Sequence, residues 1–335
     1  MRYYLPVMRL NALVLVFVTA GCGGGGGSGF TAGHPPARQP PANAVGGFSI
    51  QLPDVVLPPG GEVQPCYIFP LDVTGPSHVV GGATLNATPG MHHGNITTRP
   101  KTGDGIRACS DADSAGGSEA LDILNGGGVL FGSSTQIVGQ EWQSFPAGMG
   151  YRIKEGYEIV ARMHYLNAST APLTVAPSYQ WYTIDESTLQ NELAPFIWEY
   201  KNFTIPAGAT VTVTGDCQFP FASHPMHLVN VLPHMHKLGI EFDAAVTGGP
   251  LGGQPFLKSP GYNPDQGVLV QYDPAIDLGS VSGVTFDCTW HNTLGQDVVE
   301  GVGINEMCMM FGYAYPPSAA YSALAGPGTC LMTTP

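Results

Sequence analysis

Histidine and methionine, whose imidazole and thioether groups bind soft and borderline metal ions, gather at four places in the 335-residue sequence. These places are His92-His93, His164, His234-Met235-His236 and Met307. Residues two apart on an extended strand point to the same face, so His234 and His236 can reach one ion together. A thioether beside two imidazoles favours copper, especially the reduced ion, over zinc, magnesium or calcium. Met307 is therefore the candidate third ligand of a copper site.

The adjacent pair His92-His93 needs a different backbone. Neighbouring residues point to opposite faces of a regular strand, so this pair can share an ion only where the chain bends. Pro89-Gly90 before the pair and Gly94 after it favour such a bend. His164, inside a strand-like segment, is the candidate third imidazole. Three imidazoles suit copper and zinc equally, and a histidine of this kind taken singly is more typical of the surface or of a hydrogen-bonded core.

Length and composition indicate which elements must position these residues. Only 11% of the residues are charged, and the 46 glycines and 30 prolines disfavour helix interiors. Short segments rich in β-branched and aromatic residues alternate with turn residues, for example at 157–165, 209–214, 268–272 and 281–286. We expect an all-β protein with two antiparallel, jelly-roll-like β-sandwiches in tandem, at 48–195 and 196–335, and a cleft between them.

The first residues have the features of an export signal. Arg2 and Arg9 precede the apolar run 10–20, about half of the length that spans a bilayer. Ala20-Gly21-Cys22 then resembles the cleavage site of a bacterial lipoprotein, at which the cysteine becomes the lipid-modified first residue. We expect a signal peptide at 1–21, membrane attachment through a lipid on Cys22 only, and a Gly/Pro-rich tether at 22–47. The protein would be exported to the bacterial cell envelope; the alternative is ordinary cleavage nearby, with Cys22 left spare.

Charge and cysteine content narrow the partners and the compartment. The formal net charge is -13 and no cluster of basic residues stands out, so nucleic acid is not expected as a partner. Six cysteines remain beside Cys22, an even number that predicts disulfides in an exported chain. Cys-x-x-Cys does not occur, which argues against zinc-ribbon and thioredoxin-type sites. Spacing alone leaves the pairing of the six open.

Five motifs together resemble one family, the type II, ascorbate-dependent copper monooxygenases, which include peptidylglycine α-hydroxylating monooxygenase and dopamine β-monooxygenase. The resemblance runs from about Val63 to Cys330. The motifs are His92-His93, the stretch 162–167 around His164, the stretch 203–208, Pro225-Met226-His227 followed by the stretch 234–239, and Glu306-Met307-Cys308. One such motif is weakly specific, whereas five in the family's order and approximate spacing are strongly specific.

The resemblance implies an enzyme with two copper ions per chain. We name the two groups of ligands the first set (His92, His93 and His164) and the second set (His234, His236 and Met307). The first set would hold the copper that supplies an electron. The second set would hold the copper at which dioxygen binds and a substrate C–H bond is hydroxylated, so its three members are the predicted catalytic residues. Because one copper ion supplies one electron, a second ion completes the count for the reaction. In the family the two sites face each other across a solvent-filled cleft.

The resemblance also implies how the cysteines pair and which pocket residues differ. The implied disulfides are Cys66–Cys109, Cys217–Cys330 and Cys288–Cys308, the last of which would brace the strand that carries Met307. Leu232 stands where peptidylglycine hydroxylases have the arginine that binds the substrate carboxylate, and Met309 and Phe311 replace an asparagine and a tyrosine. These changes predict a more apolar pocket and argue against peptide amidation. Arg162 replaces a glutamine near the first set, and His227 is a candidate support for the second set.

The sequence therefore predicts a copper-dependent monooxygenase that acts on a small-molecule substrate with O2 and an external one-electron reductant such as ascorbate. The alternative from another class is a non-catalytic copper-binding or carrier lipoprotein of the cell envelope. A third possibility is a pair of sandwiches with only an adhesive or structural role.

Overall fold

The structure is a computed structural model that describes residue 30 and residues 32–114, 122, 127–133, 139–263, 269–301 and 304–333. The predicted signal peptide at 1–21 and the predicted lipidation site Cys22 lie outside these residues. Within them the chain is all-β, as predicted, and its helices are the short α1 (Asp111–Ser114), η1 (Glu186–Thr188) and η3 (Pro317–Ala319). In this part of the chain no helix combines the length and the apolar character that crossing a bilayer requires.

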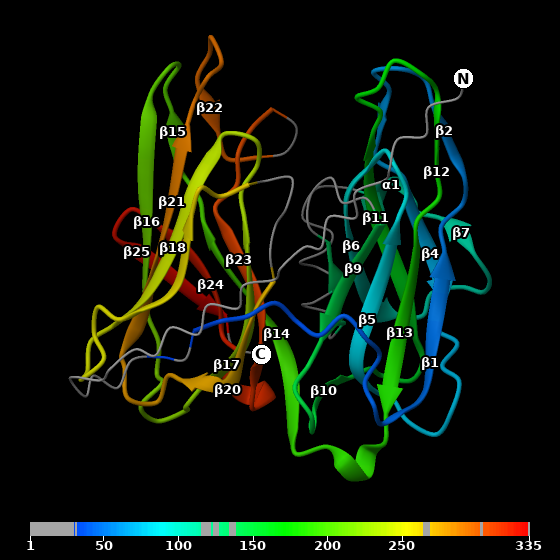
Figure 1. Ribbon diagram of the computed structural model, residues 1–335, viewed down its shortest axis with the longest axis horizontal. Coiled ribbons are helices and arrows are strands. Elements are labelled where there is room, and N and C mark those ends of the chain that lie inside the picture. The colour runs from blue at the N-terminus through cyan, green and yellow to red at the C-terminus, as the bar shows by residue number, and fades with distance from the viewer. Residues whose placement is uncertain are drawn as a thin grey trace, which may run out of the picture.

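The N-terminal half is a sandwich of two layers (Figure 1). One layer has the strand order β7-β4-β11-β6-β8 with β3 on β11, and the other has β1-β13-β5-β10 with β9 on β5. The strands are β1 (Ala44–Gln51), β2 (Val55–Leu57), β3 (Glu62–Val63), β4 (Cys66–Pro70), β5 (Val79–Ala87), β6 (Met91–Pro100), β7 (Arg107–Ala108), β8 (Val129–Gly132), β9 (Gly139–Ser144), β10 (Met149–Arg152), β11 (Tyr157–Leu166), β12 (Leu173–Val175) and β13 (Ser178–Ile184). Buried side chains such as Trp181, Phe131 and Ile159 fill the space between the layers.

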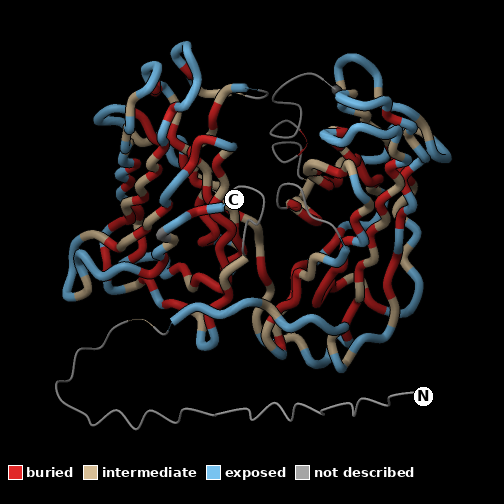
Figure 2. Tube along the Cα trace, turned by 45° about the horizontal axis from the view of Figure 1, so that its top comes forward, coloured by how far each residue is buried: buried red, intermediate tan, exposed pale blue. Residues whose placement is uncertain are grey.

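The C-terminal half is a second sandwich with its own core. One layer has the order β16-β21-β18-β19, and the other has β14-β23-β17-β20 with β24 and β25 beside β14. The strands are β14 (Asn191–Tyr200), β15 (Thr204–Ile205), β16 (Thr210–Gln218), β17 (His227–His234), β18 (Gly239–Thr247), β19 (Pro255–Pro260), β20 (Val270–Asp277), β21 (Gly283–His291), β22 (Val298–Val299), β23 (Met309–Tyr315), β24 (Ser322–Gly326) and β25 (Thr329–Thr333). Trp198, Trp290 and Phe242 are fully buried in this core, and Figure 2 shows buried segments inside each half.

Each of the four predicted strand segments overlaps a strand, although β20 begins only at Val270 and β21 only at Gly283. Strand β11 covers the predicted 157–165, and β16 covers all but the first residue of the predicted 209–214. In β16 the threonines face water, whereas Val211 and Val213 pack against the core. This alternation follows from the two-residue repeat of a strand and explains why the segment can bury only one face.

Strand β14 joins the two sandwiches. Its first residues pair in parallel with β10, through Asn191–Leu193, and the remainder pairs antiparallel with β23. Among the described strands, one eleven-stranded sheet therefore runs through both halves. The predicted domain boundary at 195/196 falls inside this continuous strand, which pairs with β10 of one half and with β23 of the other.

The described part of the segment predicted as a loose tether is mostly exposed, but it is attached to the two sandwiches at several points. Strand β1 begins at Ala44 and pairs with β13. Before it runs what we call the strap, residue 30 and residues 32–43, which crosses from one sandwich to the other (Figures 1 and 2). Phe30 packs against the C-terminal core, and His34 exchanges two backbone hydrogen bonds with Gln271 of β20.

On the N-terminal sandwich the strap is held by polar contacts. The hydroxyl of Ser144 donates to the carbonyl oxygen of Ala37, and Arg38 donates to the carbonyl oxygen of Gln140. Composition misled the prediction here, because an extended Pro-rich chain needs no core of its own when the edges of existing sheets satisfy its backbone.

Among the described residues there are three disulfides, Cys66–Cys109, Cys217–Cys330 and Cys288–Cys308. They are the pairs that the family resemblance implies. Disulfides of this kind persist in oxidising compartments, so the chain has the character of an exported protein.

Candidate metal centre

The first set gathers on two neighbouring strands, with His92 and His93 on β6 and His164 on β11. His164 lies directly opposite His93, but Tyr165 lies opposite Met91, so His92 is an extra residue in the ladder. This β-bulge is the bend that the adjacent pair requires, because a bulge turns two successive side chains toward one side. The three rings lie 4.6–5.0 Å apart between centroids, and one ligand atom from each falls within 4.8 Å of the others.

Two glycines shape this bulge. Gly90 has a φ of +89°, a left-handed conformation that lets the chain turn tightly into β6. A Cβ on Gly94 would come within 2.3 Å of the terminal methyl group of Met163, which lies across the glycine. Ser133 holds the same residue from the other side, since its hydroxyl accepts from the Gly94 amide at 2.7 Å. The bend predicted from Pro89, Gly90 and Gly94 is therefore found.

The ring nitrogens of the first set fit a metal ion. The Nδ1 atoms of His92 and His93 are buried without any hydrogen-bond partner, which is costly unless something else satisfies them. The Nε2 atom of His164 lies 2.6 Å from a carboxylate oxygen of Glu62, so Nδ1 is the nitrogen left for an ion. Three Nδ1 lone pairs in such a group suit copper or zinc.

The second set lies where β17 ends. His234 is the last residue of the strand, His236 follows in the turn, and the two rings lie 5.2 Å apart. The Nδ1 atom of His236 donates to the carbonyl oxygen of Asn305 at 2.7 Å, which leaves Nε2 for an ion. The backbone spacing predicted for this pair therefore brings its rings together.

A buried carboxylate holds this turn. Glu306, only 1% exposed, accepts hydrogen bonds from the amides of His236 and Leu238 and from the indole of Trp290, at 2.7–2.9 Å. Burial raises the pKa of Glu306, while these donors and the nearby His236 act in the opposite direction. The residue before Met307 is thus tied directly to the backbone of the His-x-His turn.

Met307 lies between two fixed neighbours. Glu306 holds it to the His236 turn, and Cys308 holds it to β21 through the disulfide with Cys288. In the β17–β23 ladder, His234 lies opposite Met309, the last pair of that ladder, and Met307 lies two residues before Met309 in the chain. Its role as the sulfur ligand stays a prediction.

The two sets lie closer together than the resemblance implies. The ring of His93 is 6.3 Å from that of His234 and 6.5 Å from that of His236, so five imidazoles form one cluster. The solvent-filled cleft that the resemblance implies therefore does not lie between these rings. Tyr313 shows why, because it projects from β23 into the N-terminal core and its hydroxyl donates to the carbonyl oxygen of Val129.

Burial keeps three rings of this cluster neutral, those of His92, His93 and His234. It lowers the pKa of His92 to about 4, with a smaller contribution from His164, and lowers the pKa of His234 to about 3, with contributions from His236 and His92. The pKa of His93 is also held well below its usual value, mainly by burial and then by His234. Neutral imidazoles are the form that binds metal ions, so at neutral pH no proton has to leave these rings first.

Apolar side chains flank the second set. Leu232, which is 8% exposed, lies opposite Phe311 in the ladder, and the ring of Phe311 is 6.0 Å from that of His234. Met309 lies opposite His234. The residues that depart from the family pattern therefore border the imidazoles, and none of the three carries a charge.

Two other sequence expectations can be placed. Arg162 forms an ion pair with Asp122 at 2.8 Å and donates to Thr97, so its charge is compensated within the N-terminal sandwich. His227 starts β17, whereas His234 ends it, which puts about 23 Å between them at about 3.3 Å per residue. Support of the second set by His227 is therefore wrong; its ring stacks on Tyr315 at 4.6 Å instead.

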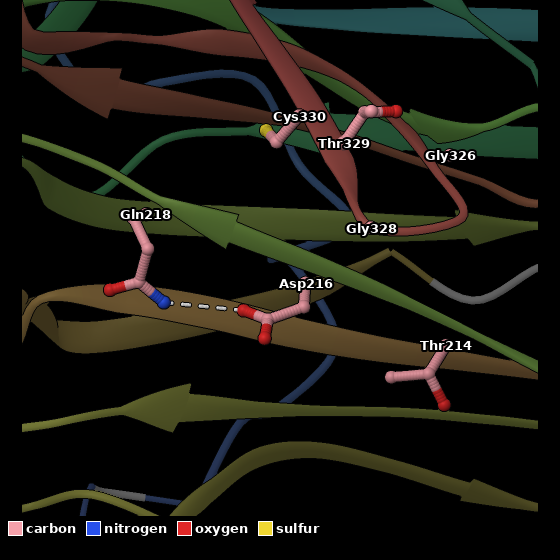
Figure 3. A pocket seen from close by; sticks show the side chains of 7 residues that line it. All are labelled: Thr214, Asp216, Gln218, Gly326, Gly328, Thr329 and Cys330. Carbon is pink, nitrogen blue, oxygen red and sulfur yellow. Dashed lines mark hydrogen bonds between the residues drawn. The ribbon is translucent and has the colours of Figure 1, made fainter.

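A surface hollow of about 380 Å³ lies elsewhere in the C-terminal sandwich, beside the disulfide of Cys217 (Figure 3). It is lined by Thr214, Asp216, Gln218, Gly326, Gly328, Thr329 and Cys330. Gln218 and Asp216 hydrogen-bond to each other there at 3.2 Å. None of the lining residues belongs to either set, so this hollow plays no part in the candidate centre.

Glu62 and Asn305 are the polar partners that sequence reasoning missed. Glu62 is 102 positions from His164, and the backbone carbonyl of Asn305 carries no side-chain signal at all. Glu62 lies on β3, a strand of only two residues. A strand this short leaves no periodic pattern in the sequence, so no local signal identified Glu62 as a partner of His164.

No protein-family model matches the chain, and no curated protein matches it. Among solved structures, it is similar to the major capsid protein P2 from bacteriophage PM2, with 8% identity, a TM-score of 0.26, and coverage of 85% of this chain and 95% of that one. It is also similar to infectious bursal virus derived T=1 particles, with 9% identity, a TM-score of 0.21, and coverage of 85% and 73%. The VP2 subviral particle of infectious bursal disease virus gives 11% identity, a TM-score of 0.20, and coverage of 84% and 75%. TM-scores of this size do not establish a common fold.

Proposed function

We propose that the chain is a copper-dependent monooxygenase, similar to the type II, ascorbate-dependent family. The observation that carries the proposal is that the histidines of each set come together: the three rings of the first set lie 4.6–5.0 Å apart, and the rings of His234 and His236 lie 5.2 Å apart. When bound, two copper ions would supply the one-electron steps by which O2 is reduced and a substrate C–H bond is hydroxylated, with ascorbate or another small reductant as electron source.

The residues of the chain have separate tasks in this proposal. The first set offers three imidazoles on paired strands, and the second set offers His234 and His236 beside Met307. Leu232 and Phe311 would border a neutral, apolar substrate and keep water away from the second set. Glu306 would keep the His236 turn in place, because its carboxylate holds two backbone amides of that turn.

The test compares Met307→Ile with Met332→Ile, a change at an exposed methionine on β25. We expect two copper ions per chain in the wild type, and hydroxylation of a neutral aromatic or aliphatic donor that incorporates isotope-labelled oxygen from O2. Met307→Ile should abolish hydroxylation and keep the first copper and the fold, whereas Met332→Ile should change nothing. Full activity of Met307→Ile would overturn the proposal.

A copper carrier is the second candidate, and the closeness of the two sets favours it, because buried imidazoles also suit tight holding of an ion. Oxygen consumption by the copper-loaded protein with ascorbate and a panel of C–H donors separates the two. A monooxygenase consumes oxygen in step with product, whereas a carrier shows only slow background oxidation of ascorbate, whichever donor is added.

A further inference from the structure

Glu62 meets the first set from a short edge strand. Strand β3 pairs with the end of β11, so that Glu62 lies opposite Leu166 and Val63 lies opposite Tyr165. From there the Glu62 carboxylate reaches back to the ring of His164, with 2.6 Å between Oε1 and Nε2. His164 is 8% exposed, whereas the side chain of Glu62 is 49% exposed, so the carboxylate closes the outer side of a buried ring.

This contact decides which nitrogen of His164 faces the set. A carboxylate oxygen can only accept, so Nε2 must carry the proton and Nδ1 must carry the lone pair. His92 and His93 have their buried, unpartnered nitrogens at the same ring position, Nδ1. The hydrogen bond therefore gives His164 the tautomer that matches the other two rings.

The corresponding contact in the second set is of a different kind. The ring of His236 donates to a backbone carbonyl, that of Asn305, at 2.7 Å, and a carbonyl carries no net charge. An anionic partner makes an imidazole a more basic ligand than a neutral partner does, and more basic ligands favour the more highly charged, oxidised ion. The two sets thus differ in the charge of the group that hydrogen-bonds to one ring in each, since the Glu306 carboxylate near His236 contacts backbone amides and not the ring.

We propose that Glu62 is the positioning residue of the first set, and that its charge makes the ion held there the stronger electron donor of the two. The inference rests on the proposed function in that it takes copper as the ion. Glu62 would act mainly through His164, whose Nε2 atom its carboxylate contacts directly, and its charge also acts on His92 at longer range.

The test uses Glu62→Ala and Glu62→Gln in the full chain, with Glu241→Gln as the control for loss of an exposed carboxylate on β18. Copper(II) affinity is measured by competition with a chelator, and the reduction potential of each site by a redox titration followed by electron paramagnetic resonance. Glu62→Ala should weaken binding at one of two sites by about 10- to 100-fold, the usual range for such partners. Glu62→Gln keeps an oxygen acceptor but loses the charge, so it should raise the potential of that site with a smaller loss of affinity.

A second measurement needs no metal. Nitrogen chemical shifts of the His164 ring in the metal-free protein, recorded at about pH 8, above the ordinary imidazole pKa, should show the Nε2-protonated tautomer. Glu62→Ala should lose this preference and Glu241→Gln should keep it. An unchanged tautomer together with unchanged affinity and potential in both Glu62 variants would overturn the inference. If the wild type takes up no copper at all, the proposed function fails, while the tautomer measurement still decides whether Glu62 orients His164.

Discussion

The first set is assembled inside a sheet, whereas the second set is assembled where a strand ends. Ladder pairing between β6 and β11, with one bulged residue, is enough to bring His92, His93 and His164 together. The His236 turn has no ladder partner and depends on the Glu306 carboxylate and the Cys288–Cys308 disulfide instead. A site built on sheet register needs little beyond correct pairing, while a site on a turn needs its own cross-links.

Acid should give the largest effect, because it acts on imidazoles of both sets at once. The folded metal-free protein keeps these rings neutral, with a pKa of about 4 for His92 and about 3 for His234, whereas the unfolded chain binds protons near pH 6.5. The unfolded state thus binds more protons below pH 6.5, so the free energy of unfolding should fall as the pH drops from about 6.5 toward 4.

Substitution of histidines in one set at a time should show how much each set contributes to the pH dependence of the free energy of unfolding. Replacing His92 and His93 together by Asn should remove more of it than His234→Asn does, because two depressed groups disappear instead of one. Urea unfolding at several pH values measures this, with the exposed His291→Asn as control. Equal pH dependence in all four proteins would show that the rings do not resist protonation.

Glu306→Ala should be the most damaging single substitution, and only for the second set. It leaves three buried donors without their charged acceptor, and hydrogen bonds to charged groups contribute about 1.5–3 kcal/mol each, so a loss of about 5 kcal/mol in the free energy of unfolding is expected. Copper content should drop from two ions to one. Glu241→Ala, at an exposed position, should change stability by less than about 0.5 kcal/mol.

Removal of single disulfides should come next. Replacing Cys66 and Cys109 by Ser opens a loop of 43 residues and should cost about 4 kcal/mol, against about 3 kcal/mol for the 20-residue separation of Cys288 and Cys308. The effect on metal should follow the opposite order, because only the second disulfide adjoins Met307. Loss of copper from the first set alone in the Cys288/Cys308 variant would contradict the comparison.

Gly94→Ala should have the smallest effect and be confined to the first set. The new methyl group meets the flexible end of Met163, so a cost of about 1–3 kcal/mol is expected, together with weaker binding of one copper ion. Gly295→Ala is the matched control, because nothing lies within 4 Å of the added Cβ. Thermal unfolding and copper titration of both variants check this, and a wild-type first site in Gly94→Ala would count against the bulge as its basis.

The sequence predicts the fold class and several strands well, but it does not predict the long-range contacts. The all-β class and several strands follow from alternating Val and Thr and from the Gly- and Pro-rich turns, since these are local properties. The bend at His92-His93 was also readable, because Pro89, Gly90 and Gly94 are local. The contacts of the strap and the hydrogen-bond partners of the rings could not be predicted, because they join segments that are far apart along the chain. Glu62 and His164, for example, are 102 positions apart.

The contact between the two sets lay equally beyond local reasoning. It arises because β14 is continuous through both sandwiches and because Tyr313 packs into the opposite core, and neither fact has a signature in the neighbouring residues. The spacing of motifs along the chain can assign ligands to a set. The distance between the two sets depends on how the two sandwiches pack against each other, which the spacing does not encode.

The strap limits how far the edges of the two sandwiches can separate. His34 is hydrogen-bonded to β20 of one sandwich, and Ala37 accepts from Ser144 of the other. The three residues from His34 to Ala37 span at most about 11 Å when fully extended. While both ends of this part of the strap stay attached, that length limits how far the edges of β20 and β9 can separate. A motion of the two sandwiches that moved these two edges further apart would have to detach one end of the strap first. A stretch of chain that contributes no ligand therefore restricts how the two sandwiches can move at these edges.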